Sequence, residues 1–341
     1  MTPPAGLEEL RAGGFLASDD AVADVHERLG VPGSGDHARV LHARVAGGLS
    51  LDVLPARGLD VGDAHVAGLP LSWRAAASDA RALDRPRGDD WASRFLGGLI
   101  TTCGPANTGP PRDGHGLHGD HHHTPARHVR TTPARGAARV VVSGDVERAD
   151  LFGPSLRTER TVTTGFDAAG RPRVVVHDRV VNTGPVPSPV AVLFHVNLGA
   201  PLVLPGTTVT TGAAEVLPRE PCPQVPEPLR LPPVCDELVE AVAEHRGVPA
   251  DATGTARAVV TSPHGFTVEV AWSAASLPRV YQWVVPTRGR WALAVEPSTA
   301  PLFGPDRSGE HAGAPVLLPG EHRDHVVAVT VLSLPENGGR P

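Results

Sequence analysis

The stretch VAVLFHVNL, at residues 190–198, has a large apolar residue at every second position. Successive side chains of a β-strand point to opposite faces, so Val190 and each second residue after it would form one apolar face. The opposite face would carry His195 and Asn197 beside the small Ala191. Because solvent-exposed faces usually carry charged groups rather than His and Asn, we interpret this face as part of a site. The alternative is a polar face in solvent, on which the histidine has no role.

The same period of two recurs along much of the chain. It is found in residues 49–53, 266–273 and 291–296, and it is the pattern that a sheet with one buried face requires. Two further strand-like stretches, 157–164 and 173–181, flank a loop that is typical of a β-hairpin. Many short strands and few helices predict an all-β fold, an antiparallel β-sandwich or barrel with few short peripheral helices.

Helix signals are few and peripheral. Ser18 could N-cap a short helix that runs through Leu29, and Asp236 could cap another that runs to His245. The Pro-rich stretch 218–233 is irregular and would form a surface excursion. We expect three parts along the chain: an N-terminal extension with a short helix (1–36), one β-sandwich domain (37–335) and a loose C-terminal tail (336–341).

Composition limits the classes of function. The chain has 341 residues, of which 40% are hydrophobic, enough to bury a sizeable core. Its formal net charge of −6 argues against a nucleic-acid-binding surface. Three cysteines without CxxC spacing, and an N-terminus without the segments of a signal peptide, favour a cytoplasmic protein. No apolar stretch reaches the ~20 residues that a membrane-spanning helix needs, so no membrane partner is expected.

A carboxylate ends another of the predicted strands. Glu296 shares a strand face with Ala292 and Ala294, and Pro297 stops the strand directly after it. Two alanines leave open space beside the carboxylate, enough for a ligand. An exposed glutamate at a strand end is the alternative, and the residues alone do not choose between the two.

A third polar candidate, His118, lies between Gly116 and Gly119, which let the backbone approach a ligand closely. Clustered histidines can also bind metal, and four others are near: His115, His121, His122 and His123. Adjacent side chains of a triple histidine diverge, and no HExxH pattern is present. We therefore expect no metal centre here, only weak adventitious metal binding.

Arg57 is the remaining candidate. It lies at a predicted strand end before Gly58, and its guanidinium offers a fork of donors to hydroxyl or carboxylate groups of a ligand. A structural ion pair with Asp60 or Asp63 is an equally good interpretation.

In their order along the chain, these segments resemble the aldose 1-epimerase (galactose mutarotase-like) superfamily, and most closely a bacterial branch of it. The resemblance spans residues 38–335. No single motif is decisive, and the specificity comes from the series. The segments that carry it are RGLDVGDA (57–64), GGLITTCG (97–104), LHG (117–119), VNTG (181–184), FHVNLG (194–199), VEP (295–297) and LPGE (318–321).

The resemblance implies a large antiparallel β-sandwich, the galactose mutarotase-like supersandwich, with a sugar in a groove on one sheet and no cofactor. It implies that His118 binds and polarises the sugar and that His195 gives a proton to the ring oxygen. Glu296 would take the proton of the anomeric hydroxyl. Asn197 and Arg57, together with His118, are then candidate substrate-binding residues.

The chain departs from the family pattern at two places. Family members have a sugar-binding aspartate between the second histidine and the glutamate, and residues 218–236 hold no convincing equivalent. They also have an arginine just upstream of the first histidine, where this chain has LITTC (99–103). Arg57 or Arg94 could take that place.

We predict a cofactor-independent isomerase that interconverts the anomers of an aldose by acid–base ring opening. Two alternatives remain open: a non-catalytic carbohydrate-binding or regulatory module on the same fold, and a metal-dependent sugar isomerase or lyase that uses the histidine-rich loop. The expected partner is a small-molecule sugar, with neither nucleic acid nor membrane. Long edge strands are compatible with a homodimer.

Overall fold

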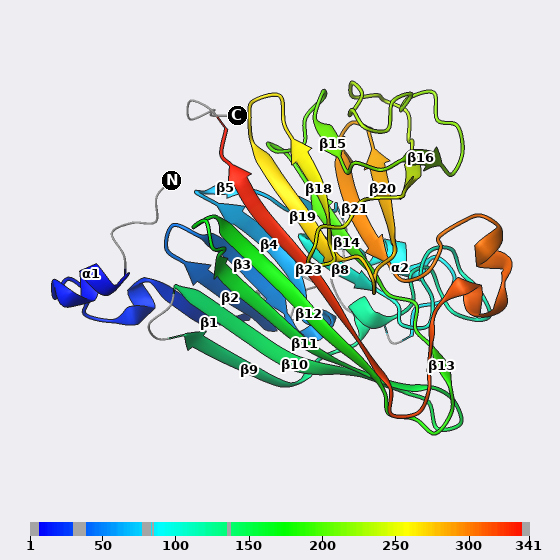
Figure 1. Cartoon of the computed structure of the whole chain (residues 1–341), viewed down its shortest axis with the longest axis horizontal. Helices are drawn as coiled ribbons and strands as arrows, with labels where there is room; N and C mark the ends of the chain where they lie inside the picture. The colour runs from blue at the N-terminus through cyan, green and yellow to red at the C-terminus, as the bar shows by residue number, and fades with distance from the viewer. Residues whose placement is uncertain (1–6, 30–38, 77–82, 84, 135–137, 336–341) are drawn as a thin grey trace.

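The computed structural model describes residues 7–29, 39–76, 83, 85–134 and 138–335. They form a β-sandwich of two large antiparallel sheets with short peripheral helices (Figure 1). The all-β antiparallel fold predicted from the alternation is thereby confirmed. The predicted tail, residues 336–341, lies outside the described residues, as do residues 1–6 and 30–38 of the predicted extension.

The first sheet has eleven strands and carries the candidate site. Its order is β1-β2-β3-β4-β8-β14-β21-β20-β17-β16, with β5 paired to β4. The strands are β1 (Ala23–Leu29), β2 (Arg39–Val45), β3 (Leu49–Leu54), β4 (Asp60–Val66), β5 (Leu69–Pro70), β8 (Ile100–Cys103), β14 (Leu193–Leu198), β16 (Glu215–Pro218), β17 (Ala241–Arg246), β20 (Arg279–Val285) and β21 (Ala292–Ser298).

The second sheet has eight strands in the order β15-β18-β19-β23-β12-β11-β10-β9. They are β9 (Arg127–Ala134), β10 (Arg139–Ala149), β11 (Ser155–Phe166), β12 (Pro172–Asn182), β15 (Thr208–Thr210), β18 (Thr255–Thr261), β19 (Thr267–Ser273) and β23 (His322–Ser333). Two small two-stranded sheets pair β6 (Trp73–Arg74) with β7 (Gly97–Gly98), and β13 (Ser188–Pro189) with β22 (Val316–Leu317).

Helical elements are short and lie outside the sandwich core. The α-helices are α1 (Leu7–Ala12) and α2 (Asp90–Ser93). The 3-10 turns are η1 (Asp19–Ala21), η2 (Pro55–Arg57), η3 (His121–His123), η4 (Pro305–Ser308) and η5 (Glu310–Gly313). None of the helices in the described ranges is long and apolar enough to cross a membrane.

The core lies between the two sheets, and β14 runs through its centre. Phe194, Val196 and Leu198 are fully buried, and the Phe194 ring contacts His325 of β23 at 6.4 Å between centroids. This is the apolar face that the period of two predicts. The other face of β14, with His195 and Asn197, is also buried, because loops rather than a second sheet cover it.

Both predicted longer helices are wrong. Ser18 does cap helical structure, accepting a hydrogen bond from the Asp20 amide, but only the single turn η1 follows. The chain then enters β1, which pairs with β2 along its whole length. The predicted helix from Asp236 to His245 is replaced by β17, which pairs with β16 and β20. Pairing with a neighbouring strand overrides a weak local helix preference in both places.

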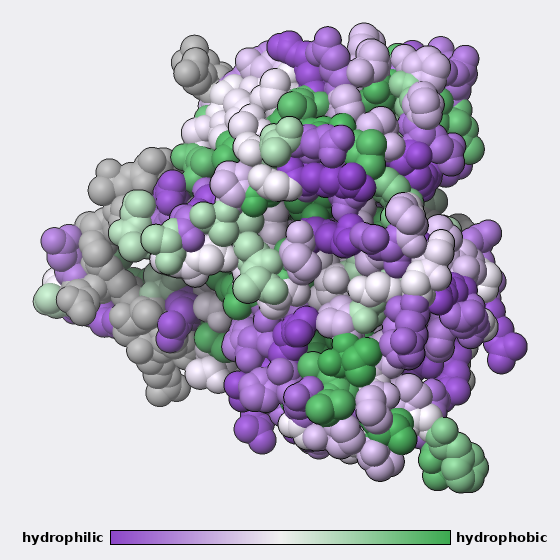
Figure 2. Space-filling view, turned by 45° about the vertical axis from the view of Figure 1, so that its right-hand side comes forward, coloured by the Kyte–Doolittle hydropathy of each residue, from purple (hydrophilic) through white to green (hydrophobic). Residues whose placement is uncertain are grey.

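The molecular face in Figure 2 mixes hydrophilic residues with separate hydrophobic patches. Large apolar side chains are exposed at scattered positions, among them Phe15, Phe152 and Leu238. In Figure 1 the Pro-rich segment between β16 and β17 (yellow-green) extends from the upper right of the sandwich.

Candidate functional site

His195 and Glu296 come together because their strands are neighbours. β14 pairs with β21 so that Leu193 lies opposite Ser298 and Val196 opposite Val295. The period of two turns His195 and Glu296 to the same face, away from the core between the sheets. His195 Nε2 lies 3.2 Å from Glu296 Oε1, and both side chains are almost fully buried, at 5% and 3% exposed.

His118 approaches the pair from the loop that precedes η3. Its backbone has φ of 56°, and its ring faces His195 with 6.1 Å between centroids. Its Nδ1 accepts a hydrogen bond from the backbone amide of Gly109 at 3.2 Å. A neutral ring that accepts at Nδ1 carries its proton at Nε2, so His118 presents an N–H donor at Nε2.

The three side chains open into one cavity, the site cavity, of about 360 Å³. This volume lies at the small end of the range typical of ligand pockets. Its aromatic lining comes from Trp91, Phe95, Trp283 and Phe303, and its polar lining from Asp89, His118, His195, Arg219, Glu240 and Glu296.

Aromatic rings keep water away from the acid–base pair. Phe95 and Trp283 each stand edge-on to the His195 ring, at 5.3 Å between centroids. Burial lowers the pKa of His195 to about 4. Burial, and then the charge of Glu240, raise the pKa of Glu296 to about 8. Because the two groups lie in contact they titrate as a pair, and between these values the pair holds one proton.

His118 is held neutral over a wide pH range. Burial, followed by the nearby His195 and Arg307, lowers its pKa to about 3. Its Nε2 therefore remains a neutral donor wherever the His195–Glu296 pair holds one proton.

Glu240 and Arg219 also line the site cavity, and the sequence did not point to either. Arg219 directly follows β16, Glu240 directly precedes β17, and their side chains form an ion pair at 2.8 Å. Trp283 Nε1 donates to the other carboxylate oxygen of Glu240 at 2.8 Å. Glu240 lies between His195 and Glu296 in the chain, where the resemblance implies an acidic residue, but just beyond residues 218–236.

Comparison with known proteins places the chain in a family. Residues 35–331 match the family described as Domain of unknown function (DUF4432). The chain belongs to this family. No curated protein matches the DUF4432 chain.

Solved structures share the fold of this DUF4432 chain. A candidate aldose 1-epimerase from Klebsiella pneumoniae has a TM-score of 0.79 at 18% identity, over 90% of this chain and 83% of its own. A galactose mutarotase-like protein from Clostridium acetobutylicum has a TM-score of 0.61 at 13% identity, over 92% and 100%. A galactose 1-epimerase from Lactobacillus acidophilus has a TM-score of 0.62 at 13% identity, over 90% and 98%. The resemblance to the galactose mutarotase-like superfamily is confirmed in its fold.

Two predicted substrate-binding residues of the DUF4432 chain lie outside the lining of the site cavity. Asn197 is fully buried, and its Nδ2 donates to the carbonyls of Gly98 and His195, each at 3.0 Å. It fixes the backbone around His195. Arg57 is also buried, with Nη1 3.0 Å from His123 Nδ1. Arg219, rather than Arg57 or Arg94, is the arginine in the cavity lining.

The histidine triplet of η3 diverges as predicted from adjacency. His122 Nδ1 lies 2.7 Å from Asp60 Oδ2, whereas His123 contacts Arg57 and His121 packs against Gly58. Within the described parts of the chain, no group of three or more His, Cys, Asp or Glu side chains could hold a metal ion. The triplet instead anchors the loop that carries His118.

That anchor is tied to a buried charge network across the two sheets. Arg160 of β11 donates to Asp60 of β4 at 2.7 Å and to Asp178 of β12 at 2.5 Å. It also donates to Thr102 Oγ1 of β8 at 2.8 Å. The network joins η3 to the strand beside β14, so it fixes the His118 loop relative to His195.

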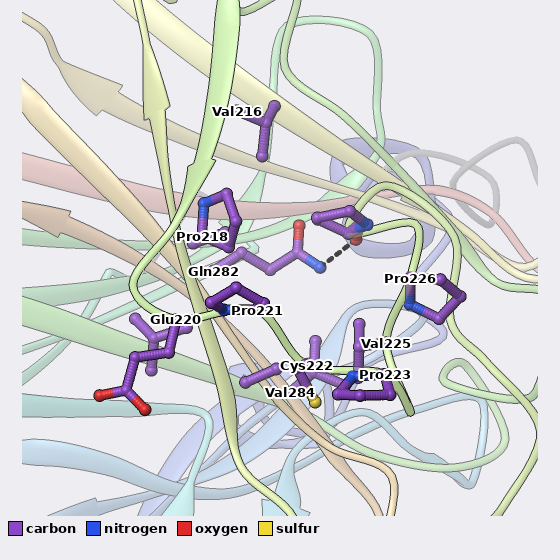
Figure 3. A pocket seen from close by; sticks show the side chains of 14 residues that line it. Val216, Pro218, Glu220, Pro221, Cys222, Pro223, Val225, Pro226, Gln282 and Val284 are labelled. Carbon is purple, nitrogen blue, oxygen red and sulfur yellow. Dashed lines mark hydrogen bonds between the residues drawn. The ribbon is translucent and has the colours of Figure 1, made fainter.

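A separate cavity of about 470 Å³ lies under the Pro-rich segment (Figure 3). Prolines and valines form most of its wall. Gln282 Nε2 donates to the Pro228 carbonyl (dashed line), and the Glu220 carboxylate is directed to one side of the cavity in that view. Its lining contains no paired acid and base, so the site cavity is the better candidate for chemistry.

Proposed function

We propose that the protein is a cofactor-independent aldose 1-epimerase, which interconverts the anomers of a sugar by opening and closing its ring. The observation that carries this proposal is the buried His195–Glu296 pair, 3.2 Å apart, facing a cavity of single-ring size. The names and folds of the compared structures support the same reaction class.

The proposed reaction moves one proton off the sugar and one onto it. Glu296 as carboxylate takes the proton of the C1 hydroxyl, while His195 as imidazolium gives its proton to the ring oxygen. The bond between C1 and the ring oxygen breaks, and an open-chain aldehyde forms. Rotation about the bond between C1 and C2, followed by reversal of both proton transfers, closes the ring as the other anomer.

Burial makes both groups more reactive in these roles. A carboxylate whose conjugate acid has a pKa of about 8 is a stronger base than an ordinary glutamate, and an imidazolium with a pKa of about 4 is a stronger acid than an ordinary histidine. Ring opening leaves Glu296 protonated and His195 neutral. That uncharged pair is the one that the dry environment favours, and between about pH 4 and 8 it is also the resting form of the free site. The charged pair that begins the reaction therefore forms by transfer of the shared proton from Glu296 to His195.

The remaining polar groups would position the sugar. The neutral Nε2–H of His118 can donate to a sugar oxygen without titrating against the pair. The Arg219–Glu240 ion pair in the same lining offers donors and acceptors to hydroxyl groups. Trp91 and Phe303 would pack against the apolar faces of the ring.

Anomer interconversion, followed by polarimetry or NMR exchange on a panel of pure aldose anomers, tests the proposal. We expect saturable acceleration for at least one aldose, and a loss of about 10²–10⁴-fold in Glu296→Gln and in His195→Asn. Glu310→Gln, at an exposed carboxylate, is the control and should keep full activity. Equal rates for Glu296→Gln and the wild type would remove the pair from the mechanism. Binding of an aldose without acceleration would support the non-catalytic carbohydrate-binding alternative.

A further inference from the structure

A second cavity of about 630 Å³, the outer cavity, adjoins the site cavity. The two share four lining residues, Ala92, Phe95, Glu240 and Trp283. The two cavities are therefore neighbours that meet at these four residues. A sugar seated in the site cavity has a neighbouring space into which a substituent can extend.

Aromatic rings line the outer cavity. Trp73 stands edge-on to Trp283, with ring centroids 5.7 Å apart, and lies 5.7 Å from Phe95. Both tryptophans remain partly exposed, and Leu238 at the same cavity is 77% exposed. Partly exposed tryptophans are suited to ligands that have one apolar face and polar edges. A pyranose ring has that character, since its C–H groups form a face and its hydroxyls project from the rim.

The polar groups at the junction fit a neutral, hydroxyl-bearing ligand. Glu240 accepts from Trp283 and from Arg219, yet its side chain is still 51% exposed. A carboxylate has about four lone-pair positions, so Glu240 can accept further hydrogen bonds from hydroxyls on either side of the junction. Its negative charge disfavours an anionic substituent at the same place. The Arg290 guanidinium adds a polar group farther along the wall, whereas the Ser93 hydroxyl donates to the Asp90 carbonyl.

We propose that the outer cavity binds a second sugar ring, so that the substrate is a reducing disaccharide or longer oligosaccharide. Its reducing-end ring occupies the site cavity, because only that ring has a free anomeric hydroxyl to place at Glu296. This inference rests on the proposed function for the orientation of the substrate. The placement of the second ring rests on the outer cavity alone.

Equilibrium binding measured by calorimetry tests the inference without relying on catalysis. The probes are a panel of monosaccharide aldoses and reducing disaccharides that carry the same aldoses at the reducing end. We expect the best disaccharide to bind at least about tenfold more tightly than its monosaccharide, the gain of a ring stacked on aromatic side chains. Ser93→Trp should fill the outer cavity and bring the two affinities together. Ser93 is exposed, and it lines only the outer cavity.

Two further variants control for folding and for the role of the aromatic wall. Ser93→Ala should bind both probes as the wild type does. Trp73→Ala should weaken disaccharide binding and leave monosaccharide binding unchanged. Equal affinity of the wild type for the two probes overturns the inference, as does a disaccharide preference that survives Ser93→Trp, or no binding of any probe. A preference that Ser93→Trp removes, in a protein that does not accelerate anomer interconversion, supports the second-ring site and refutes the epimerase.

Discussion

At the scale of single residues, the burial that makes the Glu296 carboxylate a stronger base also makes the fold less stable. Its folded-state pKa of about 8 lies above the ordinary 4.5, with burial as the largest cause. The unfolded chain therefore releases this proton at a lower pH than the folded chain does. The resulting cost to stability appears as pH rises above 4.5 and is complete above about 8. A base that is activated by burial makes the fold less stable at alkaline pH.

The variant Glu296→Gln should separate these two effects. An uncharged amide removes the base, so anomer interconversion falls, but it also removes the cost of burying a carboxylate. We expect the free energy of unfolding to exceed that of the wild type by about 2 kcal/mol at pH 8.5, with little difference at pH 4.5. Urea unfolding at the two pH values measures this. A variant less stable than the wild type at pH 8.5 contradicts the argument, and Glu310→Gln should show no pH-dependent gain.

Glu240 should set the pH range of activity. After burial, its charge is the next cause that raises the pKa of Glu296, and it also raises the pKa of His195 against the larger, lowering effect of burial. The pH dependence of kcat/KM should be bell-shaped, because activity requires one proton on the pair. In Glu240→Gln both limbs should move to lower pH. Limbs that stay fixed or move apart would show that Glu240 does not act on the pair, and NMR titration of His195 gives an independent reading.

At the scale of the element, the alternation of apolar and polar residues predicted most of the strands and which face of each is buried. The faces of β14 and β21 follow from the period of two alone, because one face of each strand must pack against the second sheet. That rule turned His195 and Glu296 each away from the core, whereas their contact depends on the pairing of β14 with β21, which the period does not predict. It says nothing about where loops fold, so the position of His118 in the site cavity came only from the resemblance.

Local sequence patterns could not predict the structure or role of residues at the sheet edge. The cap and spacing of the stretch from Asp236 to His245 predict a helix. In the structure its second half belongs to β17, because these residues pair with β16 and β20. Glu240 and Arg219 were missed for the same reason. They meet across the β16–β17 edge, and a partner strand that is distant in sequence leaves no local signal.

Gly104 directly follows β8, and it lets the backbone there pass close to Ala191 and hydrogen-bond with the His118 loop. A Cβ there would lie 2.0 Å from the Ala191 carbonyl, and its φ is +115°. Its amide donates to the His118 carbonyl and its carbonyl accepts from His121. We expect Gly104→Ala to cost about 2–4 kcal/mol of stability and most of the activity, because overpacking adds to backbone strain. Urea unfolding and the anomer assay measure the two effects.

Gly254 provides the matched control for that variant. It also has a positive φ, +78°, but no atom lies within 4 Å of the position of its Cβ. Gly254→Ala should therefore show the backbone strain alone, about 1–2 kcal/mol, with activity retained. Equal losses in the two variants would mean that the close approach at Gly104 contributes nothing.

At the scale of the whole molecule, the sandwich buries an unusual number of neutral histidines. Burial is the largest cause that lowers the pKa of His195, His121 and His325 to about 4 each, and that of His118 to about 3. His325 lies in the core between the sheets, and neither of its ring nitrogens has a hydrogen-bond partner among the described residues. When the pH falls, each of these rings either stays neutral or takes up a proton at a cost to the free energy of folding.

The direction in which stability changes with pH follows from the number of protons bound by the folded and the unfolded chain. An unfolded histidine binds a proton below its ordinary pKa of 6.5, whereas these folded histidines do not until about pH 4 or lower. Between those values the unfolded chain holds more protons, so stability is lost as pH falls from 6.5. Glu296 acts in the opposite direction over part of this range, but one carboxyl opposes at least four imidazoles.

We therefore expect the free energy of unfolding to fall steeply between pH 6.5 and pH 4.5, with more than one proton taken up on unfolding. Urea unfolding across this range gives the proton number directly from the slope. His325→Leu should reduce the slope by close to one proton, because a fully buried histidine with a pKa of about 4 contributes about 3 kcal/mol to the acid loss. His264→Leu, at an exposed histidine on the β18–β19 turn, is the control and should leave the slope unchanged. Stability that stays level to pH 4.5 would mean that the buried rings take up protons as readily in the fold as in the unfolded chain. The pKa of His195 would then not be lowered, and its imidazolium would not be the strong acid that the proposed chemistry uses.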